Sequence, residues 1–248
     1  FDLRPQAHDI INNWLFYTVA KSKLLSKKNP WSIVTISGHV QDPNGRKMSK
    51  SLGNIISPQE IIKTKGSDIL RLWVANTDYS KEMNISEEII ERAAESYRRI
   101  RNTVRFLLSN IDDLEQNQIT AEKEMLILDK WILCKANDVQ QKILNNYNDY
   151  KFHQISQDIQ NFCTIYLGGY YLDIIKDRLY TTQKNSLARR SCQTACYKIL
   201  KMINLWIAPI LSFTAEEIYQ YRKDVSKKSI FLEKWTDEKI NMDNSEKK

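Results

Sequence analysis

Apolar residues recur every three or four positions over most of the chain, which is the spacing of amphipathic helices. From Ser86 onward the pattern predicts long helices around residues 97–111, 125–143, 152–179 and 192–206, and a short helix near Thr214. Paired glycines weaken a helix, so a bend is predicted at Gly168–Gly169. Long helices with short polar connections predict an antiparallel bundle. Three apolar stripes carry this prediction: Tyr97, Ile100, Val104, Leu107 and Ile111; Met125, Leu128, Ile132, Ala136, Val139 and Ile143; Cys192, Cys196, Ile199, Ile203 and Trp206.

The first third of the chain has a different pattern. Residues 31–40 are rich in β-branched and aromatic side chains and lead into the turn sequence Asp42-Pro43-Asn44-Gly45, which predicts a strand followed by a tight turn. Residues 9–25 have helical spacing. The fold class predicted is therefore mostly α with a small α/β part. The helix, strand and loop of the first third are expected to belong to one α/β layer.

Two short helices are predicted between these regions. Ser57 has the position of an N-cap, Pro58 that of the first helical residue, and Glu60 that of the returning side chain in a capping box. Gly66 is expected to end this helix. A second helix is then expected to begin at Ser67-Asp68 and to run through Trp73.

The charge and composition narrow the class of protein. A formal net charge of +7 favours a polyanionic partner, either a nucleic acid or an anionic membrane surface. There is no apolar run of about twenty residues for a membrane span and no secretory leader, so we expect a cytoplasmic protein with no membrane partner. The four cysteines are expected to be reduced and buried, with no metal site. The absence of an initiator Met leads us to expect an internal piece of a longer chain.

The run from Gly45 to Asn54 carries the most informative chemistry. Lys47 and Lys50 can neutralise phosphate oxygens, the hydroxyls of Ser49 and Ser51 can hydrogen-bond to them, and flanking glycines allow the backbone to bend. The run therefore predicts a mobile polyphosphate clamp at the end of a strand. The alternative is a solvated basic loop.

This run, Gly45-Arg46-Lys47-Met48-Ser49-Lys50-Ser51-Leu52-Gly53-Asn54, resembles the signature loop (KMSKS) of the class I aminoacyl-tRNA synthetases. From residue 45 to about 235 further strings, including Tyr171–Arg178 and Ala208–Glu217, are similar to the bacterial isoleucine-specific members. Residues 1–44, with Arg4-Pro5-Gln6-Ala7-His8-Asp9-Ile10-Ile11 and Trp14, look more like the valine-specific members.

The resemblance implies an ATP-dependent aminoacyl-tRNA ligase, most similar to the isoleucine enzymes, with ATP, Mg2+, an amino acid and an isoleucine-type tRNA as partners. It implies that residues 1–80 are the C-terminal remnant of a Rossmann-type catalytic domain with a stem-contact linker, and residues 81–235 an anticodon-binding bundle. Residues 236–248 are expected to form a polar tail. The family's His-x-Gly-His signature is absent, so the N-terminal catalytic half is missing and the isolated piece is expected to be inactive. Alternatives are a valine-specific ligase and a non-catalytic tRNA-binding helical module.

The resemblance also assigns roles to single residues. Lys47, Ser49, Lys50 and Ser51 are the expected catalytic residues, with Lys50 the foremost. Asp9 matches the family's ribose-binding aspartate, although Ala7 replaces the glycine before it, and an ordinary helix-terminal aspartate is the alternative. Trp14 falls where the family contacts the amino-acid side chain, with core packing as the alternative. The other expected nucleotide-binding residues are Gly38, His39, Val40, Met48, Gly53 and Asn54.

Two arginine clusters are candidates for tRNA phosphate contacts. Arg98, Arg101 and Arg105 fall on one helical face, and Arg189 and Arg190 lie on a later helix together with Lys198 and Lys201. The alternative for each cluster is a merely solvated surface. Anticodon reading requires base stacking and edge hydrogen bonds. The sequence does not identify residues for that role.

Overall fold

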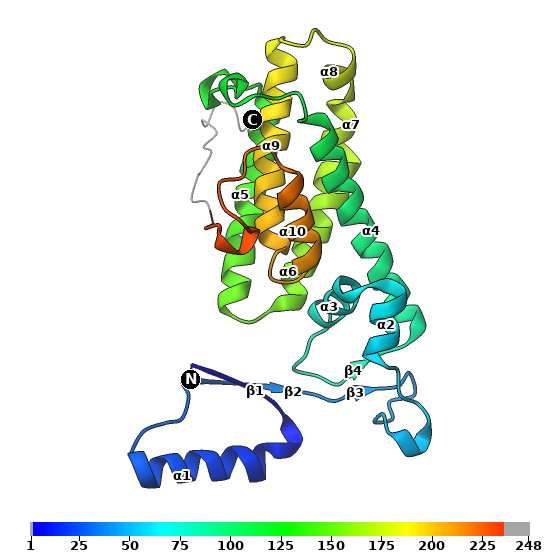
Figure 1. Ribbon diagram of the computed structural model, residues 1–248, viewed down its shortest axis with the longest axis vertical. Helices are drawn as coiled ribbons and strands as arrows, with labels where there is room; N and C mark the ends of the chain where they lie inside the picture. Colours follow the sequence, from blue (N-terminus) through cyan, green and yellow to red (C-terminus); the bar gives the residue numbers. More distant parts are fainter. Residues whose placement is uncertain (1, 236–248) are drawn as a thin grey trace.

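A tall helical bundle stands on a small α/β part in the computed structural model, which describes residues 2–235 (Figure 1). The predicted polar tail, residues 236–248, lies outside the described residues. The predicted fold class is confirmed. The main helices of the bundle are α4 (Glu87–Asn110), α5 (Ile127–Asn148), α6 (Phe152–Asn161), α9 (Leu187–Ile207) and α10 (Ser212–Tyr221).

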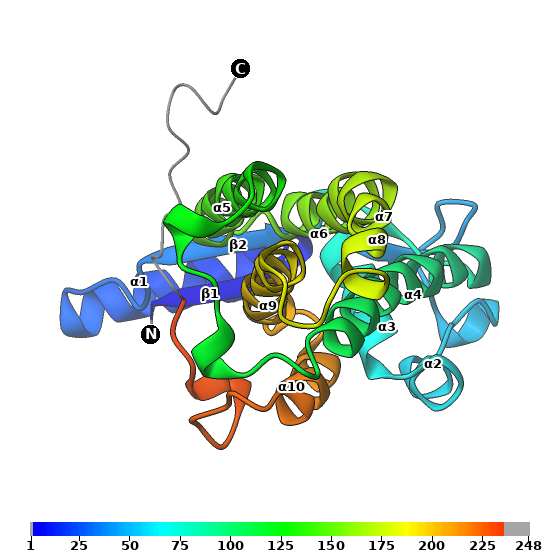
Figure 2. The ribbon, with the colours of Figure 1, turned by 90° about the horizontal axis from the view of Figure 1, so that it is seen from above.

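Helix α9 forms the centre of the bundle. Seen from above, α4, α5, α6, α8 and α10 surround it, which explains why its buried surface extends well beyond one stripe (Figure 2). All five residues of its predicted stripe are fully buried. Trp206 packs against Phe162 and donates from its indole Nε1 to Gln140 Oε1 at 3.0 Å. The predicted stripes of α4 and α5 face the same core.

The stretch predicted to bend at Gly168–Gly169 is helical but irregular. A π-helical segment, Phe162–Tyr171, follows α6 directly and includes both glycines. A Cβ on Gly168 would lie 3.1 Å from the carbonyl oxygen of Cys163, so the wider π turn brings backbone close to this position. The short helices α7 (Leu172–Ile174) and α8 (Lys176–Tyr180) continue from there.

The α/β part contains two pairs of short parallel strands. Strand β1 (Leu3–Ala7) pairs with β2 (Ile33–Ser37), and the crossover between them is irregular helix followed by α1 (Phe16–Ser26). Strand β3 (Val40–Gln41) pairs with β4 (Met83–Asn84). The sequence predicted β2 but not β1. Pro5 interrupts the pattern of β1, and proline in a strand argues against central pairing.

The two linking helices begin where predicted, but the second runs past Trp73 to Asn76 and the predicted cap of the first is absent. Helix α2 (Pro58–Lys65) ends at Gly66, and α3 (Ser67–Asn76) follows at once. The capping box at Ser57 is not formed, because the Ser57 hydroxyl donates to the Gln59 side chain at 3.0 Å instead. By contrast, the Ser86 hydroxyl caps α4 by accepting from the Ile89 N–H at 3.2 Å.

Helix α3 ties the α/β part to the bundle. The buried Asp68 carboxylate accepts from the backbone N–H and hydroxyl of Thr214, at 2.7 and 2.6 Å. Arg71 donates to the carbonyl oxygens of Pro209 and Ile210 at 2.7 and 2.8 Å. These bonds hold the signature loop and the bundle in a defined relation. Among the described residues, no helix combines the length and apolar character needed to cross a membrane.

Candidate functional site

The signature loop is a hairpin-like excursion from the end of β3. Gln41 and Lys47 form an antiparallel bridge, and the Asp42 N–H donates to the Arg46 carbonyl at 2.9 Å. Gly45 has a φ of 72°, which glycine adopts without strain. The predicted tight turn is thus confirmed, and it projects the two lysines away from the strand.

The carboxylate of Asp42 anchors the loop from inside. This side chain is almost fully buried and accepts from the Asn54 amide at 3.0 Å, from the Arg46 N–H at 2.9 Å and from Arg46 Nε at 2.8 Å. The Asn54 bond first, and the Arg46 backbone bond second, hold the pKa of the Asp42 carboxyl far below its usual value. Sequence reasoning missed this residue, although an Asp at the start of a turn commonly binds the backbone ahead of it.

Ser49 organises the tip of the loop. Its hydroxyl accepts from the Leu52 N–H at 3.2 Å and lies 3.0 Å from the Ser51 hydroxyl. Asn54 holds the opposite side, because its Oδ1 accepts from the Ser49 N–H at 2.9 Å. Gly53 closes the short turn with a φ of 62°. The two predicted hydroxyls therefore lie together at one tip.

The lysines of the loop differ in their surroundings. Lys50 is exposed, and its ammonium group has no ion-pair partner among the described residues. Lys47 Nζ lies 3.9 Å from Asp9 Oδ2. Met48, between them, packs against the core that contains Ile61 and Trp73, which secures the base of the loop. The tip is exposed rather than buried in apolar surroundings, as a phosphate clamp requires.

Three residues that the sequence singled out for different roles, Asp9, His39 and Lys47, come together. Asp9 Oδ2 lies 3.6 Å from His39 Nε2 and 3.9 Å from Lys47 Nζ, although these residues belong to three separate segments. The His39 backbone N–H donates to Glu82 Oε2 at 2.6 Å. Glu82 was not expected from the sequence, and no local pattern marks it, because it comes from the segment before β4.

Gly38 permits a close approach between two backbones. Its N–H donates to the Tyr79 carbonyl at 2.9 Å, and a Cβ at this position would lie 2.3 Å from the Lys81 carbonyl oxygen. The N–H groups of Gly38 and His39 thus bind within the protein, and Val40 lies in β3. An adenine contact from residues 38–40 stays a prediction.

Trp14 lies outside the described core. Its surface is 57% exposed, so the alternative of core packing does not hold for the described residues. The Arg4 guanidinium carbon lies 5.7 Å from the centre of its ring. Neighbouring Tyr17 and Lys21 line the same open groove. The amino-acid contact predicted for Trp14 stays a prediction.

The arginines of α4 form an exposed row. Arg98 pairs with Glu91 on its own helix, and Arg101 Nη2 lies 3.9 Å from Glu217 Oε1 on α10. Arg105 is exposed, and its guanidinium has no partner among the described residues. Of these three guanidinium groups, that of Arg105 is therefore open to an anion without the loss of an ion pair in the described part of the chain.

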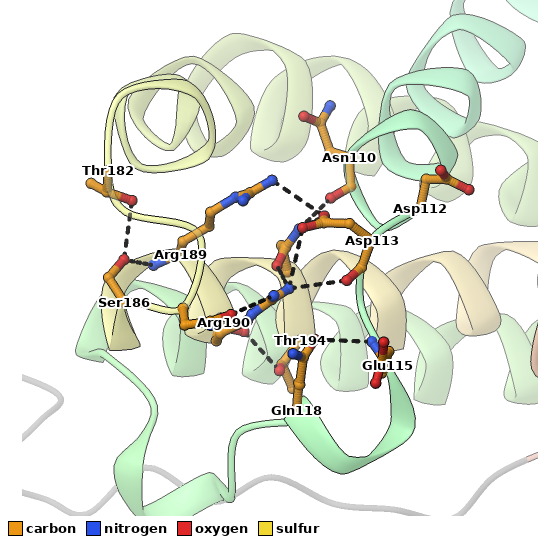
Figure 3. A network of polar contacts seen from close by, with 12 residues as sticks. Asn110, Asp112, Asp113, Glu115, Gln118, Thr182, Ser186, Arg189, Arg190 and Thr194 are labelled. Carbon is orange, nitrogen blue, oxygen red and sulfur yellow. Dashed lines mark hydrogen bonds and ion pairs between the residues drawn. The ribbon is translucent and has the colours of Figure 1, made fainter.

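The arginines of α9 have an internal role, which corrects the sequence-based expectation. The Arg190 side chain is only 7% exposed, donates to Gln193 Oε1 at 2.7 Å and Asn185 Oδ1 at 3.0 Å, and pairs with Asp113 at 3.5 Å (Figure 3). Arg189 Nη2 lies 3.2 Å from Asp113 Oδ1. Both guanidinium groups fasten α9 to the connection after α4. Phosphate contact is therefore withdrawn for Arg190, while for Arg189 it stays a prediction with less support.

The cysteines of the bundle are packing residues. Cys163, Cys192 and Cys196 are buried, and burial raises the pKa of Cys163 to about 12. A thiol with such a pKa stays protonated near neutral pH and is a poor nucleophile or metal ligand. Among the described residues, no cluster of three or more His, Cys, Asp and Glu side chains could hold a metal ion.

Comparison with protein-family models gives two matches. A model described as tRNA synthetases class I (I, L, M and V) matches residues 1–86. A model described as the anticodon-binding domain of tRNA ligase matches residues 129–248.

Curated relatives carry the name isoleucine--tRNA ligase. The chain is 53% identical over 234 residues to that of Vesicomyosocius okutanii, covering 94% of this chain and 24% of the relative. It is 46% identical over 247 residues to that of Buchnera aphidicola subsp. Baizongia pistaciae, covering 99% of this chain and 26% of the relative. This second alignment includes nearly all of residues 1–44. The chain thus spans about a quarter of the length of these relatives.

Solved structures share the fold at low sequence identity. A ternary complex of LeuRS from Agrobacterium radiobacter K84 with tRNA and LeuAMS has a TM-score of 0.71 at 17% identity, covering 97% of this chain and 29% of that one. Methionyl-tRNA synthetase from Mycobacterium tuberculosis in complex with methionyl-adenylate has a TM-score of 0.74 at 17% identity, covering 88% and 43%.

Proposed function

The chain belongs to the class I tRNA synthetases, and from this membership we propose that it forms part of an enzyme that joins isoleucine to its tRNA with ATP. The observation that carries the proposal is the exposed signature loop, which presents Lys47, Lys50 and two hydroxyls and places Lys47 beside Asp9. The 53% identity to an isoleucine--tRNA ligase supports the choice of amino acid.

The proposed reaction begins with attack of the isoleucine carboxylate on the α-phosphorus of ATP. A bond forms from the carboxylate oxygen to phosphorus, and the bond to the bridging oxygen breaks, releasing pyrophosphate and leaving the aminoacyl adenylate. No general base is needed, because the attacking carboxylate is already ionised. Negative charge grows on the β- and γ-phosphates as the leaving group departs. Donors placed there stabilise the transition state more than the ground state.

Lys50 is the residue proposed to supply most of this stabilisation. It stands on an exposed tip without an internal partner among the described residues, so no ion pair has to break before it reaches a phosphate. Lys47 and the hydroxyls of Ser49 and Ser51 assist from the same tip. By analogy with one preorganised oxyanion donor, each lysine contributes about 2–4 kcal/mol to transition-state binding.

The other proposed substrate contacts surround this loop. Asp9 accepts hydrogen bonds from ribose hydroxyls, and Gly38, His39 and Val40 border the adenine. Gly53 and Asn54 shape the loop, and Trp14 contacts the isoleucine side chain. Mg2+ enters bound to ATP, as part of the substrate.

The helical bundle is proposed to bind the tRNA that receives the amino acid. The exposed row Arg98, Arg101 and Arg105 binds tRNA phosphates, which positions the RNA without reading its sequence. Through the Asp68 and Arg71 bonds, α3 keeps this row in a defined relation to the signature loop.

Amino-acid-dependent exchange of pyrophosphate into ATP tests the proposal. The complete enzyme, with its N-terminal half, is expected to support exchange with isoleucine at low concentration and with valine only poorly. A preference for valine would establish the alternative that residues 4–14 favour. No exchange with any amino acid would support a non-catalytic tRNA-binding module. The 248-residue chain alone is expected to show none, because the His-x-Gly-His segment is missing.

A further inference from the structure

We propose that His39 is a positioning residue that holds the carboxylate of Asp9 in place for a ribose hydroxyl of ATP. The inference rests on the proposed function, in which Asp9 accepts from the ribose. In this arrangement Oδ2 of Asp9 faces His39, and Oδ1 accepts from the ribose hydroxyl.

The side-chain nitrogens of His39 and Lys47 approach the same oxygen of Asp9. His39 Nε2 lies 3.6 Å from Oδ2, and Lys47 Nζ lies 3.9 Å from Oδ2. The other oxygen, Oδ1, has no hydrogen-bond partner among the described residues. An ionised carboxylate accepts on both oxygens. Oδ1 is therefore the oxygen left for a ligand hydroxyl.

The backbone of His39 is fixed from two sides. Its N–H donates to Glu82 Oε2 at 2.6 Å, and its carbonyl oxygen accepts from the Met83 N–H at 2.8 Å. The imidazole of His8 meets its ring edge-on, with the centroids 4.7 Å apart. The His39 side chain is 22% exposed, whereas that of Asp9 is 45% exposed. The histidine is thus the more confined partner of the pair.

The two neighbours of Oδ2 differ in how they are attached. Lys47 belongs to the signature loop, and in the proposed function its ammonium group engages the phosphates, so it leaves Asp9 when ATP is bound. His39 lies in the short link between β2 and β3 and stays with the strands. With ATP bound, the His39 imidazole is the remaining neighbour of Oδ2, close enough to donate after a small shift, and it keeps Oδ1 directed toward the ribose. A carboxylate held in this way loses less conformational freedom when it binds a hydroxyl.

The test compares ATP with 2′-deoxy-ATP and 3′-deoxy-ATP in isoleucine-dependent pyrophosphate exchange by the complete enzyme. The wild type is expected to prefer ATP over at least one deoxy analogue by about tenfold or more, the value of one hydrogen bond to a charged group. In His39→Phe this preference is expected to fall severalfold through a raised KM for ATP, with kcat little changed. His39→Gln keeps an N–H donor at a similar reach and is expected to restore most of the preference.

Lys50→Ala is the matched control. It should slow exchange with all three nucleotides and leave their ratio unchanged, because it acts on the phosphates. Undiminished ribose discrimination in an active His39→Phe enzyme would overturn the inference while leaving the proposed function intact. Equal loss in His39→Phe and His39→Gln would also overturn it, since a donor would then be irrelevant. A wild type without isoleucine-dependent exchange would overturn the proposed function, and the inference with it.

Discussion

The side-chain amide of Asn54 donates to the buried carboxylate of Asp42 at 3.0 Å, so the two ends of the signature loop are joined directly. Asp42 closes the turn before the lysines, and Asn54, which follows them, also accepts from the N–H of Ser49, between Lys47 and Lys50. The cationic tip is therefore held by a polar clasp rather than by apolar packing. Such a clasp can hold the backbone in shape while the lysine side chains remain free to move.

Asp42→Ala and Asn54→Ala are each expected to reduce kcat/KM for ATP in pyrophosphate exchange by roughly tenfold to a hundredfold, because the loop loses its shape. Their effects should not add in the double variant, since both remove the same bond. Asp112→Ala, which changes an exposed carboxylate in the bundle, is the control. Fully additive losses would show that the two residues act separately.

Lys50→Ala in the complete enzyme is expected to slow isoleucine activation by roughly a hundredfold to a thousandfold, the effect of removing one oxyanion donor. Its unfolding transition should not move, because the side chain is exposed and without a partner in the described part of the chain. Lys63→Ala, on α2, should leave both quantities unchanged. An unaltered turnover in Lys50→Ala would mean that the loop is only a solvated basic segment.

Arg105→Ala is expected to weaken tRNA binding and to reduce the slope of log K against log salt by about 0.7–0.9, as one phosphate contact is lost. Arg190→Lys should keep the wild-type slope, since the side chain is buried against Asp113. It is expected to lower the free energy of unfolding by roughly 1–3 kcal/mol, because lysine cannot replace the guanidinium fork. Salt titrations of tRNA binding and urea unfolding of the same variants measure both effects. A reduced slope for Arg190→Lys would restore the original expectation.

Asp129 provides a pH-dependent prediction. Its fully buried carboxylate accepts from the hydroxyls of Tyr171 and Ser191, at 2.6 and 2.5 Å, and lies 3.3 Å from Arg178 Nη1. Desolvation outweighs these contacts and raises the pKa of Asp129. The folded state then binds the proton more tightly than the unfolded state, so the stability that this group contributes falls as pH rises from about 4 through the raised pKa.

The measurement compares urea unfolding of the wild type and Asp129→Asn between pH 4 and pH 7. The wild type should lose stability relative to the variant over this range, because only the wild type must ionise a buried acid. Asp138→Asn, an exposed position on the same helix, should give a difference that varies little with pH. If the wild type instead gained relative stability with rising pH, the Tyr171, Ser191 and Arg178 contacts would outweigh desolvation.

Much of the bundle could be predicted from the sequence because its helices obey a local rule. The stripes of α4, α5 and α9 pack into one core as expected, Gly66 ends α2 where predicted, and the expected short helix contains Thr214. Strand β1 was missed, because its partner β2 is thirty residues away and Pro5 hides the pattern. The capping box at Ser57 was wrong, because a competing contact with Gln59 was locally available.

The residues of the candidate site also fall into those that the sequence predicted and those that it did not. Lys47, Ser49, Lys50 and Ser51 could be found from a short run of residues, because their chemistry is contiguous in the chain. Asp9 and His39 were expected singly, but Glu82 and the contacts among the three could not be predicted, because three distant segments bring them together. Arg190 of α9 was misjudged for the related reason that a sequence does not record which charges are buried.

The sequence alone therefore determined the helical character of the chain, the position of the loop and the cationic chemistry it carries, since each depends on neighbours within a few residues. Tertiary structure decided which polar groups meet. Asp42 binds Asn54 and so anchors the loop, Arg190 pairs with Asp113 inside the bundle, and His39 lies beside Asp9. The physical reason is range: periodicity and turn preferences act within one or two turns of chain, whereas hydrogen bonds and desolvation depend on segments that only folding brings together.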